Sequence, residues 1–352
     1  TMCTAWNYKA IEGEESILGV LPFFHVYGMT TVLIFSVMLG NRMVLLPKFD
    51  VETALKTIDK QKPTIFPGAP TIYIGLLNHP DIQKYDLSSI VACLSGSAPL
   101  PLEVQEKFEK VTGGRLVEGY GLTETSPVTH ANLIYAEDRI KGSVGIPWPD
   151  TEAAIFAVDS TTPLPFGEIG EIAVKGPQVM KGYWNNDDAT AAAIPDGWFR
   201  TGDLGYIDED GFLFIKGRLK NMILGPSGEN IYPEEIETVL NSHAFVSESV
   251  VTEQDGRLVA LVHFDTEAIE KLKDEFMTKL EITRDEWNHK KDEWNKRMEE
   301  IKQEVMKYVN SKVNRFSRIA EVVEEEKEFE KTPSKKIRRF LYERRGKNED
   351  KK

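Results

Sequence analysis

An alternation of strand and helix runs through residues 90–126, which read IVACLSGSAPLPLEVQEKFEKVTGGRLVEGYGLTETS. Residues 90–94 form a short apolar run typical of a strand, and residues 102–111 have the apolar spacing of a helix. A second short run, 115–117 (RLV), leads into two glycines around Tyr120. Short apolar strands that alternate with helices are typical of a parallel sheet with both faces covered. This stretch therefore predicts an α/β fold.

The same alternation extends toward the N-terminus. It consists of strand-like runs at 16–21 and 43–46 and helical runs at 51–60 and 71–78. The most apolar run, 32–39, falls well short of the ~20 residues that a membrane span needs, so it predicts a buried helix. We expect residues 1–139 to form a parallel α/β layer.

The pattern changes twice further along the chain. Residues 140–217 contain short strand-like runs separated by Gly, Pro and Asp, which is typical of an antiparallel sheet or a small β-barrel. Residues 218–352 are mixed, with a helix start at Pro233 and two strand-like runs that flank Asp255 and Gly256. The predicted third part is therefore an α+β domain.

A charged helical stretch, 266–312, predicts a helical insertion in the third part. Thr283 and Glu286 form a capping box, so a second helix is expected to begin there. Its apolar residues recur at helical spacing: Trp287, Trp294, Met298, Ile301, Val305 and Tyr308. Such a seam serves either a coiled coil with a partner or packing on its own domain. Fewer than four clear heptads favour packing on its own domain.

Composition and charge exclude several classes of protein. The chain has 352 residues, of which 41% are hydrophobic and 28% charged, as in ordinary globular proteins. Its formal charge of -13 argues against general nucleic-acid binding. Two cysteines, Cys3 and Cys93, cannot build a disulfide framework, which suits a reducing cytosol. With no secretory signal or membrane span, the expected location is cytoplasmic, and peripheral membrane contact stays open.

Residues 118–124, EGYGLTE, combine groups that suit a nucleotide. Glycines allow a close approach of the backbone to a ligand, and an aromatic face such as that of Tyr120 can stack on a base. Thr123 can hydrogen-bond a phosphate, and Glu124 can hold Mg²⁺ together with substrate phosphates. The structural alternative is a glycine-rich turn with a surface carboxylate.

Two later segments add to this set. Asp203 is placed at a strand start, where a carboxylate can accept both hydroxyls of a ribose. Arg218 offers a planar cation for phosphate or ribose oxygens. The segment 331–347 has eight basic residues against one acid, which by itself indicates a solvated face or a weak anion binder.

In this order, the segments resemble the AMP-forming acyl-CoA synthetase family, which includes luciferase and the adenylation domains of peptide synthetases. The resemblance runs from the motif LPFFHVYG at 21–28 to Lys336, and the segments 182–185 and 227–237 look most like those of long-chain fatty acid–CoA ligases. It implies activation of a fatty acid with ATP and Mg²⁺ to an acyl adenylate, followed by transfer to CoA.

The resemblance also implies roles for individual residues on the nucleotide side. The adenine-binding positions match Ser97, Ala98, Pro99, Glu118, Gly119, Tyr120 and Gly121. The phosphate, Mg²⁺ and ribose contacts match Thr123, Glu124, Asp203 and Arg218. Lys336 matches the lysine that binds the carboxylate and the α-phosphate during adenylation.

Further roles concern the acyl group, CoA and domain motion. Lys220 matches the hinge about which the C-terminal domain rotates. The positions beside the acyl pocket match His25, Tyr27, Gly28 and Gly96. The loop presented for the thioester step matches Ser227, Gly228, Glu229 and Asn230.

Two departures from the family matter. The Ser/Thr/Gly-rich loop that ends in Pro-Lys-Gly and grips the β- and γ-phosphates has no match in residues 1–352. The chain is therefore expected to be the C-terminal portion of a ligase, inactive alone. Lys335 stands where the family usually has Gly, so it rivals Lys336. The alternatives are a ligase that loads a carrier protein, and a non-catalytic nucleotide-binding or interaction fragment. Acyl chain length and oligomeric state are not readable from these motifs.

Overall fold

The computed structural model describes residues 9–135, 140–225, 228–279, 287–332 and 336–343. The chain divides into two compact units, Thr1–Ile215 and Lys216–Lys352, and each is described by itself. The expected division into three parts, with boundaries near 139 and 217, stays a prediction. Five residues of the sequence predictions lie outside the described residues: Cys3, Ser227, Thr283, Glu286 and Lys335.

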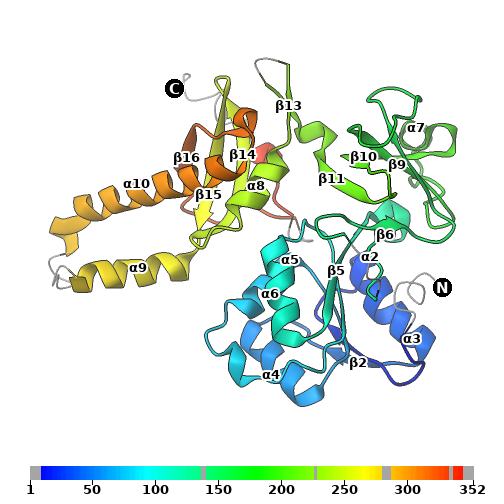
Figure 1. The fold of residues 1–352 in the computed structure, drawn as a ribbon, viewed down its shortest axis with the longest axis horizontal. Coiled ribbons are helices and arrows are strands. Elements are labelled where there is room, and N and C mark those ends of the chain that lie inside the picture. Colours follow the sequence, from blue (N-terminus) through cyan, green and yellow to red (C-terminus); the bar gives the residue numbers. More distant parts are fainter. Residues whose placement is uncertain (1–8, 136–139, 226–227, 280–286, 333–335, 344–352) are drawn as a thin grey trace. The chain divides into compact units, whose positions relative to one another are not determined.

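The first unit contains a seven-stranded sheet in the order β2-β1-β3-β4-β5-β6-β7 (Figure 1). The pairs from β2 to β5 are parallel, and β6 and β7 continue the sheet in antiparallel pairs. The strands are β1 (Ser16–Gly19), β2 (Arg42–Leu45), β3 (Ile65–Gly68), β4 (Ala92–Ser95), β5 (Arg115–Gly121), β6 (Val128–Ala131) and β7 (Ile146–Pro147). The predicted parallel α/β layer is confirmed.

Helices cover both faces of this sheet because neighbouring residues of each strand point to opposite sides. On β1, Leu18 packs under α4 (Val51–Gln61), α5 (Pro70–Leu77) and α6 (Leu102–Thr112). Ile17 packs on the other face, with residues of α2 (Val26–Gly28), the π-helix η1 (Met29–Ile34) and α3 (Phe35–Leu39). The alternation repeats on the next strands, so two apolar cores enclose the sheet.

The buried helix predicted at 32–39 is only half correct. Val32 and Phe35 are buried against the sheet, whereas Ile34, Val37 and Met38 are 51%, 69% and 46% exposed. A helix turns about 100° per residue, so a single sheet can bury only one stripe of it. The uniformly apolar run did not reveal which stripe this would be.

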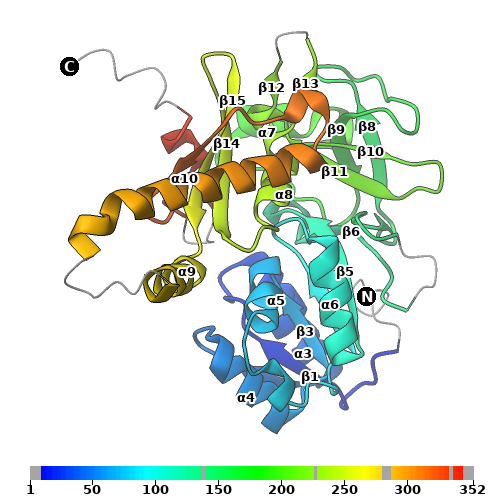
Figure 2. The same cartoon turned by 60° about the vertical axis from the view of Figure 1, so that its left-hand side comes forward.

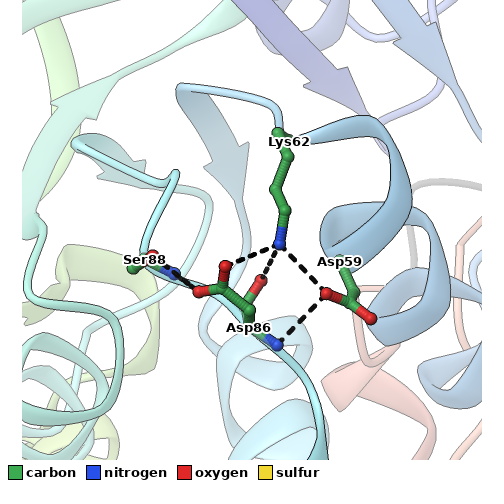
Figure 3. A network of polar contacts seen from close by, with 4 residues as sticks. All are labelled: Asp59, Lys62, Asp86 and Ser88. Atoms are coloured by element: carbon green, nitrogen blue, oxygen red, sulfur yellow. Dashed lines mark hydrogen bonds and ion pairs between the residues drawn. The ribbon is translucent and has the colours of Figure 1, made fainter.

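A polar network holds the end of α4 to the loop before β4 (Figure 3). Lys62, which ends α4 with a φ of 49°, places its amine 3.0 Å from Asp59 and 2.7 Å from Asp86. Asp86 also accepts hydrogen bonds from the amide and hydroxyl of Ser88. Lys62 and Ser88 lower the pKa of the Asp86 carboxyl. These groups are exposed to solvent, so the network orients a loop and adds little stability.

An antiparallel sheet follows, in the order β11-β10-β9-β8. Its strands are β8 (Glu152–Phe156), β9 (Gly170–Lys175), β10 (Phe199–Ile207) and β11 (Leu213–Arg218), and the short helix α7 (Asp187–Ala193) precedes β10. Ile172, Phe199 and Leu213 form its core, and Tyr120 of β5 packs into the same cluster. Of the two predicted alternatives, an antiparallel sheet or a small β-barrel, the structure has a four-stranded antiparallel sheet over residues 152–218.

The second unit is built on a sheet in the order β14-β15-β16, with β14 (Val246–Gln254), β15 (Arg257–Phe264) and β16 (Glu321–Glu324). Asp255 and Gly256 form the predicted turn, both with positive φ. The remaining elements include β12 (Ile223–Leu224), β13 (Asn230–Ile231), α8 (Pro233–Leu240), α9 (Thr266–Lys279), α10 (Trp287–Lys312), η5 (Leu219–Asn221) and η7 (Arg339–Leu341).

The helical insertion packs on its own domain, as predicted (Figure 2). Met298, Ile301 and Val305 of α10 are buried in one cluster with Ala260 and Val262 of β15. The opposite face of the sheet packs on the C-terminal segment through Phe329 and Tyr342. The apolar seam of α10 therefore packs on the sheet of its own domain.

Candidate active site

The predicted adenine-binding residues lie at the C-terminal edge of the parallel strands. Residues 97–99 follow β4, and residues 119–121 end β5. The Leu100 amide donates to Oε1 of Glu118 at 3.2 Å, which ties the two segments together. Ligands of open α/β sheets bind at this edge, because the loops beyond it are open to a ligand. The structure thus brings both halves of the predicted adenine site side by side.

Glu118 lies in an unusual electrostatic environment. Glu118 is partly exposed as a whole residue, but burial of its carboxyl group raises the pKa of that group to about 8. The hydrogen bond from the Leu100 amide lowers the pKa and only partly offsets burial. Near pH 7 the carboxyl group is therefore mostly protonated, and it can donate a hydrogen bond as well as accept one.

Glu118→Gln is expected to stabilise the chain at high pH. The folded-state pKa of about 8 lies above the ordinary value of 4.5, so folding takes up a proton between these two values. Stability from this group is therefore lost as pH rises from about 4.5 to 8. Glutamine cannot ionise, so at pH 9 the variant should exceed the wild type in stability by on the order of 5 kcal/mol. Urea denaturation at pH 5 and pH 9 measures this; equal pH slopes for both proteins would contradict the assignment.

A hydrogen bond joins two predicted nucleotide-binding residues from different sheets. The hydroxyl of Tyr120 on β5 donates to Oδ2 of Asp203 on β10 at 2.7 Å. Tyr120 is 9% exposed and Asp203 is 5% exposed. The backbone of Asp203 is held in turn, because its amide donates to the hydroxyl of Thr201. Other residues already cover most of the Tyr120 ring, so the structure offers little free ring surface to a base. Stacking of a base on Tyr120 stays a prediction.

The sequence interpretation missed a buried histidine beside this pair. His130 on β6 lies opposite Tyr120 in the strand register, with the ring centroids 6.2 Å apart. Burial lowers its pKa to about 3, so its imidazole is neutral. Nδ1 contacts the hydroxyl of Thr129 at 2.9 Å, and among the described residues Nε2 has no hydrogen-bond partner. No motif marks His130; only the antiparallel register of β5 and β6 places it.

The predicted phosphate and Mg²⁺ residues sit on a short helical turn, η3 (Thr123–Thr125). Thr123 is exposed, and Oε1 of Glu124 accepts a hydrogen bond from the Tyr183 hydroxyl at 3.1 Å. In the described residues, no group of three or more His, Cys, Asp or Glu side chains could hold a metal. One half-buried carboxylate suits Mg²⁺, which needs one or two carboxylates when substrate phosphates supply other ligands. Glu124 therefore fits that ion, though only with a nucleotide present.

Three of the residues predicted beside the acyl pocket, His25, Tyr27 and Gly28, belong to the short helix α2 and its cap, and the fourth, Gly96, follows β4. His25 caps this helix through Nδ1, which accepts from the Tyr27 amide at 3.2 Å. The buried Tyr27 hydroxyl donates to the Leu94 carbonyl at 2.6 Å. A Cβ atom at Gly96 would lie 3.3 Å from the Tyr27 ring, and one at Gly28 would lie 2.7 Å from a backbone oxygen. The backbone oxygen of Pro22 therefore excludes a side chain at Gly28, whereas a side chain at Gly96 would require a small shift of the Tyr27 ring.

An apolar cavity lies between η1, α3 and the sheet. Seven residues line it: Thr31, Phe35, Ile65, Pro67, Leu94, Val128 and Trp148. Leu94 also accepts the Tyr27 hydrogen bond, which links the cavity to the predicted pocket residues. The sequence interpretation did not identify this lining. Its members come from five separate segments, so only the three-dimensional fold brings them together.

The remaining predicted residues belong to the second unit. Arg218 ends β11, and Lys220 lies in the turn η5. Two contacts fix this stretch to the first turn of α8: Lys216 to Glu235 at 2.7 Å, and Asn221 to Glu234. The predicted hinge residue Lys220 therefore lies between two attachment points, next to the boundary of the two units at 215.

The predicted CoA-side loop and the catalytic lysine are both at the surface. Gly228 has a φ of 85°, and Glu229 accepts at its backbone oxygen from the Gly225 amide at 2.8 Å. Asn230 begins β13. Lys336 is exposed, and its backbone bonds to Thr332. Its rival Lys335 lies outside the described residues, so the choice between them stays a prediction.

Comparison with known proteins gives one sequence family and several similar structures. The profile described as "AMP-binding enzyme" matches residues 1–184. The long-chain-fatty-acid–CoA ligase of Bacillus subtilis is 60% identical over 250 residues, covering 71% of this chain and 44% of that protein. The ligase of the same name from Salmonella typhimurium is 41% identical over 237 residues, 67% of this chain and 42% of that protein. The chain thus spans less than half the length of these curated relatives.

The solved structures cover more of the chain. ATP-bound MatB from Rhodopseudomonas palustris matches with a TM-score of 0.76 and 27% identity, over 97% of this chain and 62% of that one. O-succinylbenzoate CoA synthetase from Bacillus subtilis, in complex with AMP, matches with a TM-score of 0.73 and 27% identity, over 95% and 61%. Among the described helices, none has the length and apolar character to cross a membrane.

Proposed function

Because the chain belongs to the AMP-binding enzyme family, we propose that it takes part in the ATP-dependent activation of a fatty acid to acyl-AMP and then to acyl-CoA. The relatives named as long-chain-fatty-acid–CoA ligases support the substrate class. The observation that carries the proposal is the 2.7 Å hydrogen bond between Tyr120 and Asp203, which lie 83 positions apart. This bond supports the proposal because it joins residues from two of the proposed nucleotide-binding motifs.

In the proposed adenylate site, each group of residues has a physical task. The backbone of 97–99 and of 119–121 lines the adenine at the sheet edge. Asp203 accepts the ribose hydroxyls, and Thr123 donates to a phosphate oxygen. Glu124 would hold Mg²⁺, which supplies positive charge to the phosphates when bound. The attack of a carboxylate on the α-phosphate joins two anions, so positioning and positive charge dominate catalysis.

The second unit would supply the mobile charges. Lys336 and Arg218 would neutralise the phosphate and orient the ribose during adenylation. Rotation at Lys220 would then withdraw Lys336 and present residues 228–230 for the thioester step. Such rigid-body motion about a few hinge residues is a common way to change an active site between two steps.

The apolar cavity is the proposed site of the fatty acyl chain. Its lining is almost entirely hydrocarbon, and Leu94 connects it to Tyr27 and Gly96. The cavity volume is about 20 Å³, room for one water-sized group, so the cavity would have to widen before it takes several carbons.

The 352-residue chain is expected to bind AMP but not to release pyrophosphate from ATP. It offers the adenine, ribose and Mg²⁺ groups, whereas no loop ending in Pro-Lys-Gly is present to hold the β- and γ-phosphates. Calorimetry with AMP and a pyrophosphate-release assay with ATP, Mg²⁺ and palmitate measure the two properties. Turnover as fast as that of the Bacillus subtilis relative would contradict the expected inactivity, and absence of AMP binding would contradict the proposed site.

The identity of the acyl acceptor is a separate test. CoA dependence of thioester formation from a supplied acyl adenylate distinguishes a CoA ligase from an enzyme that loads a carrier protein. We expect acyl-CoA to form when CoA and the acyl adenylate are supplied without a carrier protein.

A further inference from the structure

We propose that Thr332 is a positioning residue for Lys336. It acts from two segments, 329–332 and 336–342, which an antiparallel β-bridge joins and which are called the Lys336 hairpin below. Each segment is anchored to the body of the second unit. The inference rests on the proposed function, in which Lys336 contacts the phosphate of the adenylate. All of the groups involved lie in the second unit, so the argument does not depend on how the two units are arranged.

The backbone of Lys336 is bound twice by one residue. The Thr332 amide donates to the Lys336 carbonyl at 2.8 Å. In return, the Lys336 amide donates to Oγ1 of Thr332 at 3.2 Å. The adjacent pair, Lys331 and Ile337, forms a β-bridge. The hydroxyl of Thr332 belongs to its side chain, so a substitution at this position can remove the bond to the Lys336 amide.

One side of the hairpin is anchored through a buried ion pair. Nη1 of Arg339 lies 2.7 Å from both carboxylate oxygens of Glu237 on α8. Nη2 of the same residue donates to the Val251 carbonyl on β14 at 3.1 Å. The side chains of Arg339 and Glu237 are 16% and 11% exposed. This cation therefore fixes the chain three residues beyond Lys336 to a helix and a strand.

The other side is anchored through Lys331. Its amine lies 2.8 Å from Glu248 of β14, and both side chains are 24% exposed. The Glu330 amide donates to the Tyr342 hydroxyl at 2.8 Å, and the Tyr342 ring packs on Phe329. The chain that leads to Thr332 is therefore held against the same sheet as Arg339.

This arrangement meets a requirement of the proposed chemistry. A lysine side chain is long and flexible, so its amine reaches one point reproducibly only when its backbone is fixed. A misplacement of about 1 Å at a reacting centre can cost a factor of about 100 in rate. The two anchors place the hairpin, and the Thr332 hydroxyl sets the direction in which Lys336 leaves it.

The test compares the affinities of the 352-residue chain for AMP and adenosine, measured by calorimetry. Their ratio isolates recognition of the phosphate. Lys336→Ala should lower this ratio by about tenfold or more, the loss expected for a hydrogen bond to a charged group. Thr332→Val removes the hydroxyl but keeps the branched shape, and should lower the ratio about three- to tenfold. Thr332→Ser should restore it.

A control and a second measurement separate positioning from general damage. Glu328→Gln removes the exposed contact of Lys331 and leaves the anchor to Glu248, so it should not change the ratio. Amide exchange of Lys336, followed by NMR, should be faster in Thr332→Val than in the wild type or Thr332→Ser.

The outcomes distinguish the two proposals. If Lys336→Ala lowers the ratio but Thr332→Val leaves both the ratio and the amide exchange unchanged, the positioning role is overturned. If the wild type has no preference for AMP, or Lys336→Ala does not reduce it, the proposed function fails at this residue. The exchange measurement then still tests whether Thr332 holds the backbone.

Discussion

Asp203→Ala is expected to lower the affinity of the chain for AMP by roughly 10- to 150-fold, the value of a hydrogen bond to a charged group at about 1.5–3 kcal/mol. The side chain is 5% exposed, and Tyr120 fixes the position of its carboxylate at 2.7 Å. In the proposed site, a carboxylate held in this way accepts the ribose hydroxyls without reorienting, so its removal should affect binding strongly. Calorimetric titration with AMP measures the loss.

Two control variants sharpen this result. Tyr120→Phe keeps the ring and removes only the hydroxyl that orients Asp203, so the loss should be about two- to tenfold. Glu209→Ala removes an exposed acid from the turn after β10 and should leave AMP affinity unchanged. If Asp203→Ala bound AMP as well as Glu209→Ala does, Asp203 would not be the ribose-binding residue.

Arg339→Ala is expected to destabilise the second unit by about 3–5 kcal/mol, because it leaves the Glu237 carboxylate buried without its cation. Burial already raises the pKa of Glu237 to about 7, while Arg339 acts to lower it. The substitution also removes the donor to the Val251 carbonyl on β14. Hydrogen exchange of the amides in β14 and β15 reports this opening locally, and exchange should become faster across both strands.

Two further variants test whether loss of the Arg339–Glu237 ion pair causes this destabilisation. Arg338 is exposed and adjacent, so Arg338→Ala should leave exchange in β14 and β15 close to that of the wild type. The double variant Glu237→Leu with Arg339→Met removes both charges, and it should recover much of the stability. Equal exchange rates in Arg339→Ala and Arg338→Ala would mean that the ion pair does not hold the C-terminal segment.

Local features of the fold could be predicted from the sequence because local residues determine them. Asp255 and Gly256 adopt the positive φ values of a tight turn, and the two strands beside them follow from that turn. The seam of α10 was predicted from spacing alone, since Met298, Ile301 and Val305 fall on one face of a helix. In both cases the information lies within a few turns of chain.

Features that depend on contacts between distant segments could not be predicted in the same way. The run 32–39 is apolar throughout, so only the sheet beneath it decides that Val32 and Phe35 are buried while Val37 is exposed. The cavity lining is scattered over five segments. The neutral state of His130 likewise results from burial by neighbours that are remote in sequence.

The same difference between local sequence signals and distant contacts applies to the candidate site. Motifs predicted that residues 97–99, 119–121 and Asp203 serve one nucleotide, and the structure places the first two segments side by side and Asp203 against Tyr120. The contact between Glu124 and Tyr183 and the anchors of the Lys336 hairpin carry no sequence signal. They arise from the packing of separate elements, and they are what orients the predicted groups.

The most direct measurement of the central claim is a crystal structure of the 352-residue chain with a bound acyl-adenylate analogue. The account predicts ribose hydroxyls on the Asp203 carboxylate, adenine against 97–99 and 119–121, and the phosphate beside Thr123. An analogue bound at another place, with no contact to the Asp203 carboxylate, would contradict it.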